Sequence, residues 1–245
     1  MLIDISNSFT KIAPAGRDSL AAEPFMLPTP ELDAGALGRL PWAAPDDGFN
    51  VVLSSVVPER NAAVREAFGA DSVLEVEPSI ELGVAIDYPE PASIGADRLA
   101  DAAAAVNFYG APVVAVDFGT AVTFDIVSPA GAYVGGVIAP GLAAMTDYMF
   151  DRTALLPKID IQEPASVIGK STEGAMHAGA VIGYRGLVKE ILAQIGTELG
   201  LDRRPPVVAT GGYAALISQG LPEIDTVHAN LTLEGLRIIG GMNCP

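Results

Sequence analysis

Twice in this chain, a short apolar run ends in an aspartate that is followed by one hydrophobic residue and then by small or hydroxylated residues. The first run is Leu2-Ile3 before Asp4 to Ser8, and the second is Val113 to Val116 before Asp117 to Ala121. Such a run predicts a buried strand, and the small residues predict a tight turn directly after it. We therefore expect two halves, residues 1–107 and 108–245, each containing one such strand and turn.

The two turns have a composition that suits phosphate binding. Small residues let backbone N–H groups approach phosphate oxygens, hydroxyl groups add donors, and an aspartate at a strand end can hold a cation. A single turn of this kind also occurs at ordinary strand ends capped by Asp, Ser or Thr. Two of them, together with a glycine turn at Thr210 to Gly212 that could admit a flat ligand, favour phosphate binding over coincidence.

The rest of the chain alternates predicted strands and helices. Strands are predicted at 51–57, 71–76, 121–127, 133–138 and 207–209, and helices at 58–68, 95–109, 141–155, 174–199 and 231–239. Residues 13–48 are rich in Pro, Gly and Asp, and they predict short strands and a helix without definite bounds. This order indicates an α/β fold with parallel strands joined through helices.

A second polar group stands at Gly95 to Arg98, where an alanine-rich helix is expected to begin. A carboxylate beside a guanidinium stays ionised, so Asp97 could take a proton from a substrate hydroxyl while Arg98 binds a carboxylate or phosphate. Alternatively, the two residues could lie on the first turn of the helix as a match to its dipole and a surface ion pair. Their spacing alone leaves both interpretations open.

Composition narrows the partners that the chain can have. A net charge of −16 gives no basic surface for nucleic acid or an anionic membrane, and no apolar run reaches the roughly 18 residues of a membrane span. The single cysteine, Cys244, rules out an internal disulfide, so we expect a cytoplasmic protein. His177 and His228 lack a second ligand at metal spacing, which predicts structural roles.

Taken in order, these segments resemble the type III pantothenate kinases, which phosphorylate pantothenate at the first step of coenzyme A synthesis. The resemblance spans nearly the whole chain and is strongest between Ile94 and Gly174. It is carried by six segments: Ile94 to Arg98, Val116 to Asp125, Gly135 to Gly141, Ile168 to Thr172, Thr210 to Gly212 and Leu231 to Leu236. It implies an α/β fold of duplicated actin-like ATPase (ribonuclease H-like) halves, with mixed sheets flanked by helices.

The resemblance also implies a role for particular residues. Asp97 would be the general base, and the pantothenate site would comprise Tyr88, Gly95, Ala96, Asp97 and Arg98, with Thr172 supplied by the partner subunit of a homodimer. Asp117 would bind a monovalent cation, K⁺ or NH₄⁺, and Thr120 would contact ATP, which acts with Mg²⁺. The first phosphate loop would comprise Asp4, Ile5, Ser6, Asn7, Ser8, Phe9, Thr10 and Lys11.

The first loop departs from the family pattern of Asp, any residue, Gly, Asn, Thr. Here Ser6 and Ser8 replace the glycine and the threonine. Ser8 keeps a hydroxyl, but Ser6 adds a side chain where backbone should approach phosphate, and serine does not readily adopt a positive φ. Beside an active pantothenate kinase, this departure leaves open a catalytically weak relative that acts as a regulatory or binding protein. A kinase of another small hydroxy acid on the same scaffold is a further alternative.

Overall fold

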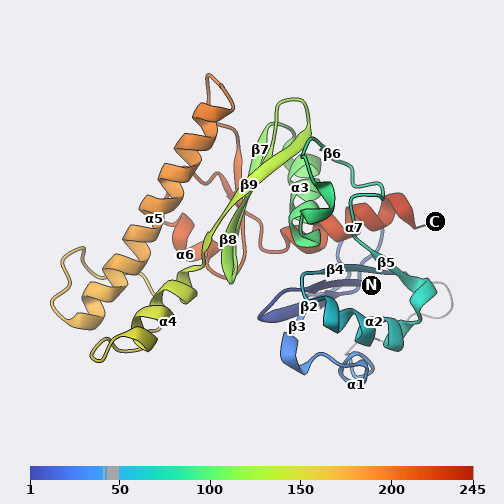
Figure 1. The fold of residues 1–245 in the computed structure, drawn as a ribbon, viewed down its shortest axis with the longest axis horizontal. Helices are drawn as coiled ribbons and strands as arrows, with labels where there is room; N and C mark the ends of the chain where they lie inside the picture. The colour runs from blue at the N-terminus through green and yellow to red at the C-terminus, as the bar shows by residue number, and fades with distance from the viewer. Residues whose placement is uncertain (41, 43–49, 245) are drawn as a thin grey trace. The chain divides into compact units, whose positions relative to one another are not determined.

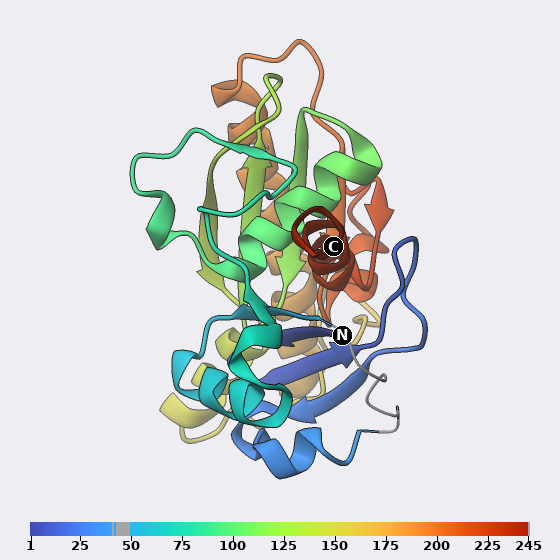
Figure 2. The same cartoon turned by 90° about the vertical axis from the view of Figure 1, so that its right-hand side faces the viewer.

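The computed structural model describes residues 1–40, 42 and 50–244, and these fall into two units. Unit 1 comprises Met1–Gly110, Pro129–Gly135 and the chain from Asn230 onward, whereas unit 2 comprises Ala111–Ser128 and Gly136–Ala229. Unit 1 is therefore assembled from three separate segments of the chain. Figures 1 and 2 show the elements of both units.

Unit 1 contains a five-stranded mixed sheet in the order β3-β2-β1-β4-β5. Strand β1 pairs antiparallel with β2 and parallel with β4, so the sheet combines a hairpin with parallel crossovers. The strands are β1 (Leu2–Ile5), β2 (Phe9–Ala13), β3 (Phe25–Pro28), β4 (Val51–Ser55) and β5 (Val73–Glu75).

Helices cover both faces of this sheet (Figures 1 and 2). The unit 1 helices are α1 (Ala34–Leu37), α2 (Asn61–Phe68), α3 (Ala96–Tyr109) and α7 (Leu231–Asn243), with short 3-10 turns at Thr29–Glu31, Pro58–Arg60, Ala70–Ser72 and Pro91–Ser93. Because successive strand residues point to opposite faces, Val51 and Leu53 pack in one core cluster with Leu37 of α1 and Val64 of α2. Val52, between them, faces Gly240 of α7.

Small residues let α3 and α7 approach closely. A side chain at Gly235 of α7 would overlap the backbone carbonyl of Ala100 in α3, and Ala102 to Ala105 of α3 are buried. A helix pair at this distance leaves no room for a methyl group at position 235. The alanine-rich stretch of the sequence therefore forms the part of α3 that is buried inside unit 1.

The second sheet has six strands in the order β11-β10-β7-β8-β9-β6. Strands β7 and β8 form an antiparallel hairpin, and β10 runs parallel to β7 with Thr210 opposite Asp117. The strands are β6 (Ala85–Ile86), β7 (Val113–Phe118), β8 (Ala121–Val127), β9 (Ala132–Pro140), β10 (Val207–Thr210) and β11 (Thr226–Val227). The first residues of β9, which belong to unit 1, pair with β6.

Three helices belong to unit 2: α4 (Leu142–Arg152), α5 (Thr172–Glu198) and α6 (Ala214–Ser218). The long helix α5 packs against α4 and α6. Its buried side chains recur at Val181, Tyr184, Val188, Leu192 and Ile195, which is the spacing of one helix face.

The predicted α/β fold with mixed sheets and flanking helices is confirmed. The strand at 121–127 is observed as predicted, whereas the predicted helix at 58–68 divides into a 3-10 turn and α2. Within the 13–48 segment, residues 41 and 43–49 lie outside the described residues. In the described part of the chain, no helix is both long enough and apolar enough to cross a membrane.

Candidate active site

Asp97 is the second residue of α3, directly after the helix begins at Ala96. Its Oδ1 accepts a hydrogen bond from the backbone N–H of Arg98 at 2.8 Å. That N–H is in the first helical turn and has no partner within the helix, so the carboxylate satisfies it and also matches the helix dipole. Asp97 is thus held at the start of α3 by the backbone.

Burial raises the pKa of Asp97 above its usual value, although the Arg98 N–H and the Arg98 charge both act against this. A carboxylate with a raised pKa is a stronger base than an exposed one, which suits proton abstraction. Gly95 leaves room for this group, because a methyl group at position 95 would lie 2.5 Å from Asp97 Oδ1. Gly95 therefore determines where the carboxylate can lie.

One tyrosine ring contacts the neighbouring guanidinium, and a second tyrosine packs against that ring. The Arg98 Cζ lies 5.8 Å from the centroid of the Tyr133 ring, and the Tyr88 and Tyr133 rings meet edge to face with centroids 6.2 Å apart. The pairing of β6 with β9 sets this arrangement, since Ile86 lies opposite Tyr133 and the Asp87 N–H donates to the Tyr133 carbonyl. Cation–π contact with a buried ring fixes the direction of Arg98.

Backbone freedom at Gly135 completes this part of unit 1. Gly135 has a φ of +130°, and a methyl group there would lie 3.4 Å from Tyr88 Cε2. The structure therefore links Tyr88 to the Gly95 to Arg98 segment through Tyr133, and it places Gly135 beside Tyr88. A glycine inside a predicted strand is the sequence signal that could have identified position 135.

The first predicted phosphate loop is the turn between β1 and β2. Asp4, Ile5 and Thr10 are buried, whereas Asn7, Ser8 and Phe9 are exposed at the tip. Lys11 lies opposite Asp4 in the strand register. The turn is braced from β3's side, because the Thr29 hydroxyl donates to the Ser6 carbonyl at 2.7 Å and the Thr29 N–H donates to the Ser8 carbonyl.

Ser6 fits the backbone of this turn without strain. In the described ranges, no residue other than glycine has a positive φ, so position 6 does not require glycine. The Ser6 N–H donates to the Phe9 carbonyl at 3.2 Å, and its hydroxyl donates to Asp4 Oδ2 at 3.4 Å. The expectation that serine would be conformationally unfavourable here was wrong, because the turn closes through its own hydrogen bonds rather than through a left-handed residue.

The second predicted phosphate loop is the two-residue turn Gly119-Thr120 between β7 and β8. Phe118 lies opposite Val122 in the hairpin, Asp117 is half-buried, and Thr120 is exposed. Gly211 follows β10 with a φ of +91°, and a side chain there would overlap Asp117 Oδ1 and lie 2.6 Å from the Phe118 carbonyl carbon. The glycine turn at 210–212 therefore lies directly against Asp117.

Gly141 closes the other side of this turn. A side chain at position 141 would overlap the Thr120 carbonyl oxygen and lie 2.7 Å from that of Gly119. Gly141 is also the N-cap of α4, so the first turn of that helix begins beside Thr120. Helix N-termini attract anions through their unpaired N–H groups and dipole. Three sequence segments that were separate candidates thus meet within unit 2.

Thr172 is the first residue of α5 and is exposed. The preceding Ser171 caps the helix, because its hydroxyl accepts from the Gly174 N–H at 3.0 Å. A side chain at Gly169 would overlap the backbone N of Ala175, so the segment before Thr172 folds back tightly over the start of α5. Among the residues that the structure describes, no three acidic, histidine or cysteine side chains form a metal-binding group.

Comparison with known proteins identifies the family. The sequence profile of type III pantothenate kinase matches residues 1–194. A type III pantothenate kinase of Akkermansia muciniphila is 51% identical over 250 residues, covering 99% of this chain and 98% of the relative. The chain belongs to the type III pantothenate kinase family. The six segments on which the resemblance rests all lie within the length that this relative shares.

Solved structures confirm the fold. A structure from Campylobacter jejuni, described as a Baf family transcriptional activator, aligns with a TM-score of 0.65 at 19% identity, covering 99% of this chain and 98% of its own. A structure from Sinorhizobium meliloti, described as a 2-dehydro-3-deoxygalactonokinase protein, aligns with a TM-score of 0.59 at 14% identity, covering 98% and 95%. The type III pantothenate kinase chain therefore has the actin-like fold of small-molecule kinases.

Proposed function

We propose that this chain transfers the γ-phosphoryl group of ATP to the terminal hydroxyl of pantothenate and forms 4'-phosphopantothenate, the first step of coenzyme A synthesis. Membership of the family supports this activity over nearly the full length of the chain. The observation that carries the proposal is the position of Asp97, a partly buried carboxylate with a raised pKa at the start of α3 beside the ordered Arg98.

In the proposed reaction, Asp97 takes the hydroxyl proton of pantothenate as its oxygen attacks the γ-phosphorus. The bond from that phosphorus to the bridging oxygen of ADP breaks in line with the attack. Arg98 binds the pantothenate carboxylate or neighbouring polar groups, and Tyr88, Gly95 and Ala96 line the same pocket. Mg²⁺ bound with ATP would compensate the phosphate charge, and the protein contributes positioning and proton transfer.

The two turns are the proposed ATP-binding elements. Asp4 to Lys11 would approach the phosphates with the exposed tip at Asn7 and Ser8, and Thr120 would donate its hydroxyl. Asp117 would hold a monovalent cation, K⁺ or NH₄⁺. The residues present suit such a cation. The half-buried Asp117 carboxylate offers the hard oxygen ligands that K⁺ prefers, and the Gly211 backbone lies close to this carboxylate with no side chain between them.

A direct assay tests the activity. Purified protein with ATP, Mg²⁺ and pantothenate should release ADP and form phosphopantothenate, faster with K⁺ or NH₄⁺ than with Na⁺ at equal ionic strength. Equal rates with all three ions would contradict the cation role alone. An inert protein that is stabilised against heat by pantothenate but not by ATP would instead be a binding protein, and turnover of another hydroxy acid in place of pantothenate would change the substrate.

We also propose a homodimer in which Thr172 reaches the pantothenate of the partner subunit. Support comes from apolar side chains that unit 2 exposes around the start of α5: Ile138, Met145, Tyr148, Phe150, Leu155, Val167, Ile168 and Ile182. Exposed apolar groups in this number are typical of an interface. With a single cysteine and no internal disulfide to form, we place the reaction in the cytoplasm.

Subunit complementation tests the shared site. Asp97→Asn and Thr172→Val homodimers should each be strongly impaired, because each lacks one part of every site. Mixed and re-equilibrated in equal amounts, they should recover about a quarter of wild-type activity, since half of the dimers would be mixed and each would hold one intact site. No recovery, with mixed dimers shown by mass spectrometry, would place both residues in one subunit; a monomer by light scattering would remove the dimer.

A further inference from the structure

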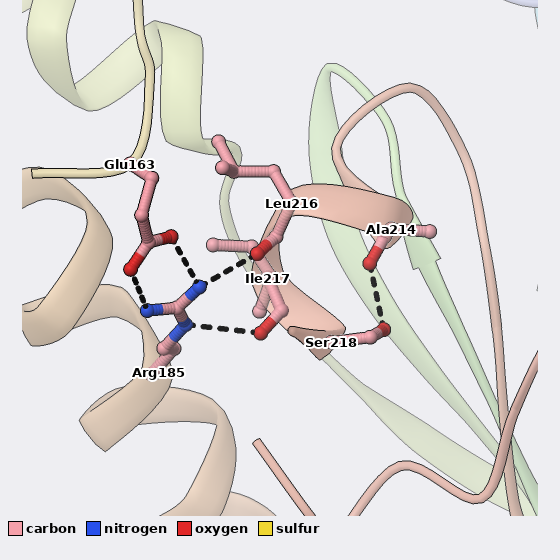
Figure 3. A network of polar contacts seen from close by, with 6 residues as sticks. All are labelled: Glu163, Arg185, Ala214, Leu216, Ile217 and Ser218. Atoms are coloured by element: carbon pink, nitrogen blue, oxygen red, sulfur yellow. Dashed lines mark hydrogen bonds and ion pairs between the residues drawn. The ribbon is translucent and has the colours of Figure 1, made fainter. Parts of the chain in front are cut away.

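Arg185 of α5 is an unusually well-ordered arginine outside the residues discussed so far. Only 11% of its side chain is exposed, and its guanidinium forms two parallel hydrogen bonds with the Glu163 carboxylate, Nη1 to Oε1 at 2.8 Å and Nη2 to Oε2 at 2.7 Å (Figure 3). Nη2 also donates to the Leu216 carbonyl at 2.7 Å, and Nε donates to the Ile217 carbonyl at 3.0 Å. Four donor hydrogens of the guanidinium are therefore used.

The carbonyl partners belong to the last turn of α6, where the helix dipole favours a cation. The Ile217 carbonyl also accepts from the Gln219 and Gly220 backbone N–H groups. Gly220 packs against the guanidinium, since a methyl group there would lie 2.6 Å from both Cζ and Nη1. An exposed ion pair contributes little to stability, but a planar arginine held by a carboxylate, two carbonyls and a glycine has one orientation.

Glu163 lies in the 153–171 segment, which connects α4 to α5. A second contact fastens the same segment to α5: the His177 Nε2 is 3.0 Å from the Asp160 carbonyl oxygen. Residues 177 and 185 are eight apart, so they lie on nearly the same face of the helix two turns from each other. The segment is therefore attached to α5 at two points before it ends at Ser171 and Thr172.

Helix α6, which Arg185 contacts at its end, is connected at its start to the glycine turn at 210–212. Helix α6 begins at Ala214, just after Gly211 and Gly212, and the Tyr213 N–H donates to the Phe118 carbonyl at 3.4 Å. Arg185 thus holds the end of the short helix whose start is joined to the Asp117 turn. A shift of α6 along its own axis would move the glycine turn with it, because only five residues separate the two ends.

We propose that Arg185 is a positioning residue for the kinase reaction, which joins the helix after the glycine turn to the segment leading into Thr172. This inference rests on the proposed function of those two elements. Arg185 itself contacts neither substrate. It acts by fixing two backbone segments, one on the ATP side of the reaction and one on the pantothenate side.

Three variants distinguish the contact of Arg185 with the 153–171 segment from its contact with α6. Glu163→Gln keeps the arginine on α6 but removes the charge that holds the 153–171 segment, so it should raise the KM for pantothenate about fivefold and leave the KM for ATP within about twofold. Arg185→Lys loses the paired hydrogen bonds to Glu163 and the hydrogen bonds to the α6 carbonyls. It should therefore raise the KM for pantothenate and the KM for ATP about fivefold or more. Gly220→Ala leaves every partner in place but displaces the guanidinium, and it should resemble Arg185→Lys.

Matched controls lie on the same helix. Lys189→Gln removes a neighbouring ion pair, Lys189 to Glu223, which is separate from the Arg185 contacts. Gly196→Ala adds a methyl group where nothing lies within 4 Å. Both should leave the two KM values unchanged. If Arg185→Lys and Gly220→Ala lower the melting temperature but alter neither KM nor kcat, Arg185 is merely structural and the inference is wrong. An inactive wild-type protein would instead overturn the proposed function, so the two failures are distinguishable.

Discussion

Asp97→Asn should abolish phosphopantothenate formation, with kcat reduced by at least about 100-fold, while pantothenate still binds. The asparagine keeps the size of the side chain and an oxygen to accept from the Arg98 N–H, so the start of α3 should be preserved. What is lost is the carboxylate that we propose takes the hydroxyl proton. Steady-state kinetics together with calorimetric binding of pantothenate would measure the two effects separately.

The same substitution should make the folded protein more stable at neutral pH. Burial raises the pKa of Asp97, so ionising it costs free energy in the folded state. This cost is absent below the unfolded-state pKa, develops as pH rises through the folded-state pKa, and is complete above it. Asp97→Asn removes the cost, so its melting temperature should exceed that of the wild type at pH 7 and the difference should vanish in acid. The acidic limb of the wild-type pH–rate profile should lie above the usual Asp pKa.

Two further variants test whether the position of the Asp97 carboxylate matters. Gly95→Ala keeps the carboxylate but places a methyl group 2.5 Å from its Oδ1, so kcat should fall about tenfold or more through displacement alone. Glu90→Gln changes an exposed carboxylate close by in the chain and should have no effect on kcat. If Asp97→Asn kept wild-type kcat, the base would have to be another group and the mechanism would fail.

Gly211→Ala is expected to have the second large effect, on both ATP binding and stability. An L-residue at a φ of +91° costs about 1–3 kcal/mol, and the new methyl group would overlap Asp117 Oδ1 and press on the Phe118 backbone. We expect the melting temperature to fall by about 5–10 °C and the KM for ATP to rise about tenfold or more. Thermal denaturation with and without ATP measures both.

The adjacent glycine provides the control for stability. Gly212 has nothing within 4 Å of its hypothetical methyl group, and its φ is not in the left-handed region. Gly212→Ala should therefore leave the melting temperature of the free protein nearly unchanged. If both variants were equally stable, close contact with the Asp117 turn would not be the reason for a glycine at position 211.

The sequence predicted best those elements whose residues bury one continuous face. Helix α3 was predicted from its alanines and β8 from a segment rich in β-branched residues and phenylalanine, and both are observed near the predicted bounds. Strands β2 and β3 were not placed, because their segments are short and gain their stability from pairing, β2 with β1 and β3 with β2. Strands β6 and β11, of two residues each, have no periodicity to detect.

The candidate site likewise contains residues that the sequence identifies and residues that it does not. Asp97, Arg98 and the Asp117 turn are contiguous segments, so their chemistry can be identified from the residue types. Tyr133 and Arg185 depend on contacts between segments far apart in the chain, and nothing in the residues beside them indicates those contacts. Ser6 was misjudged for a related reason. Its backbone conformation is determined by hydrogen bonds to Phe9 and from Thr29, which a local rule about glycine does not include.

Helix α7 has a consequence for how the protein is made. Domains usually fold in order as the chain leaves the ribosome, from the N-terminus onward. Here α3, which carries Asp97, packs through Ala100 on Gly235, a residue that is translated more than a hundred positions later. Helix α3 must therefore wait, with the face that contacts Gly235 uncovered, until α7 has been synthesised. Synthesis of α7, rather than of the first hundred residues, should be the moment at which unit 1 becomes native.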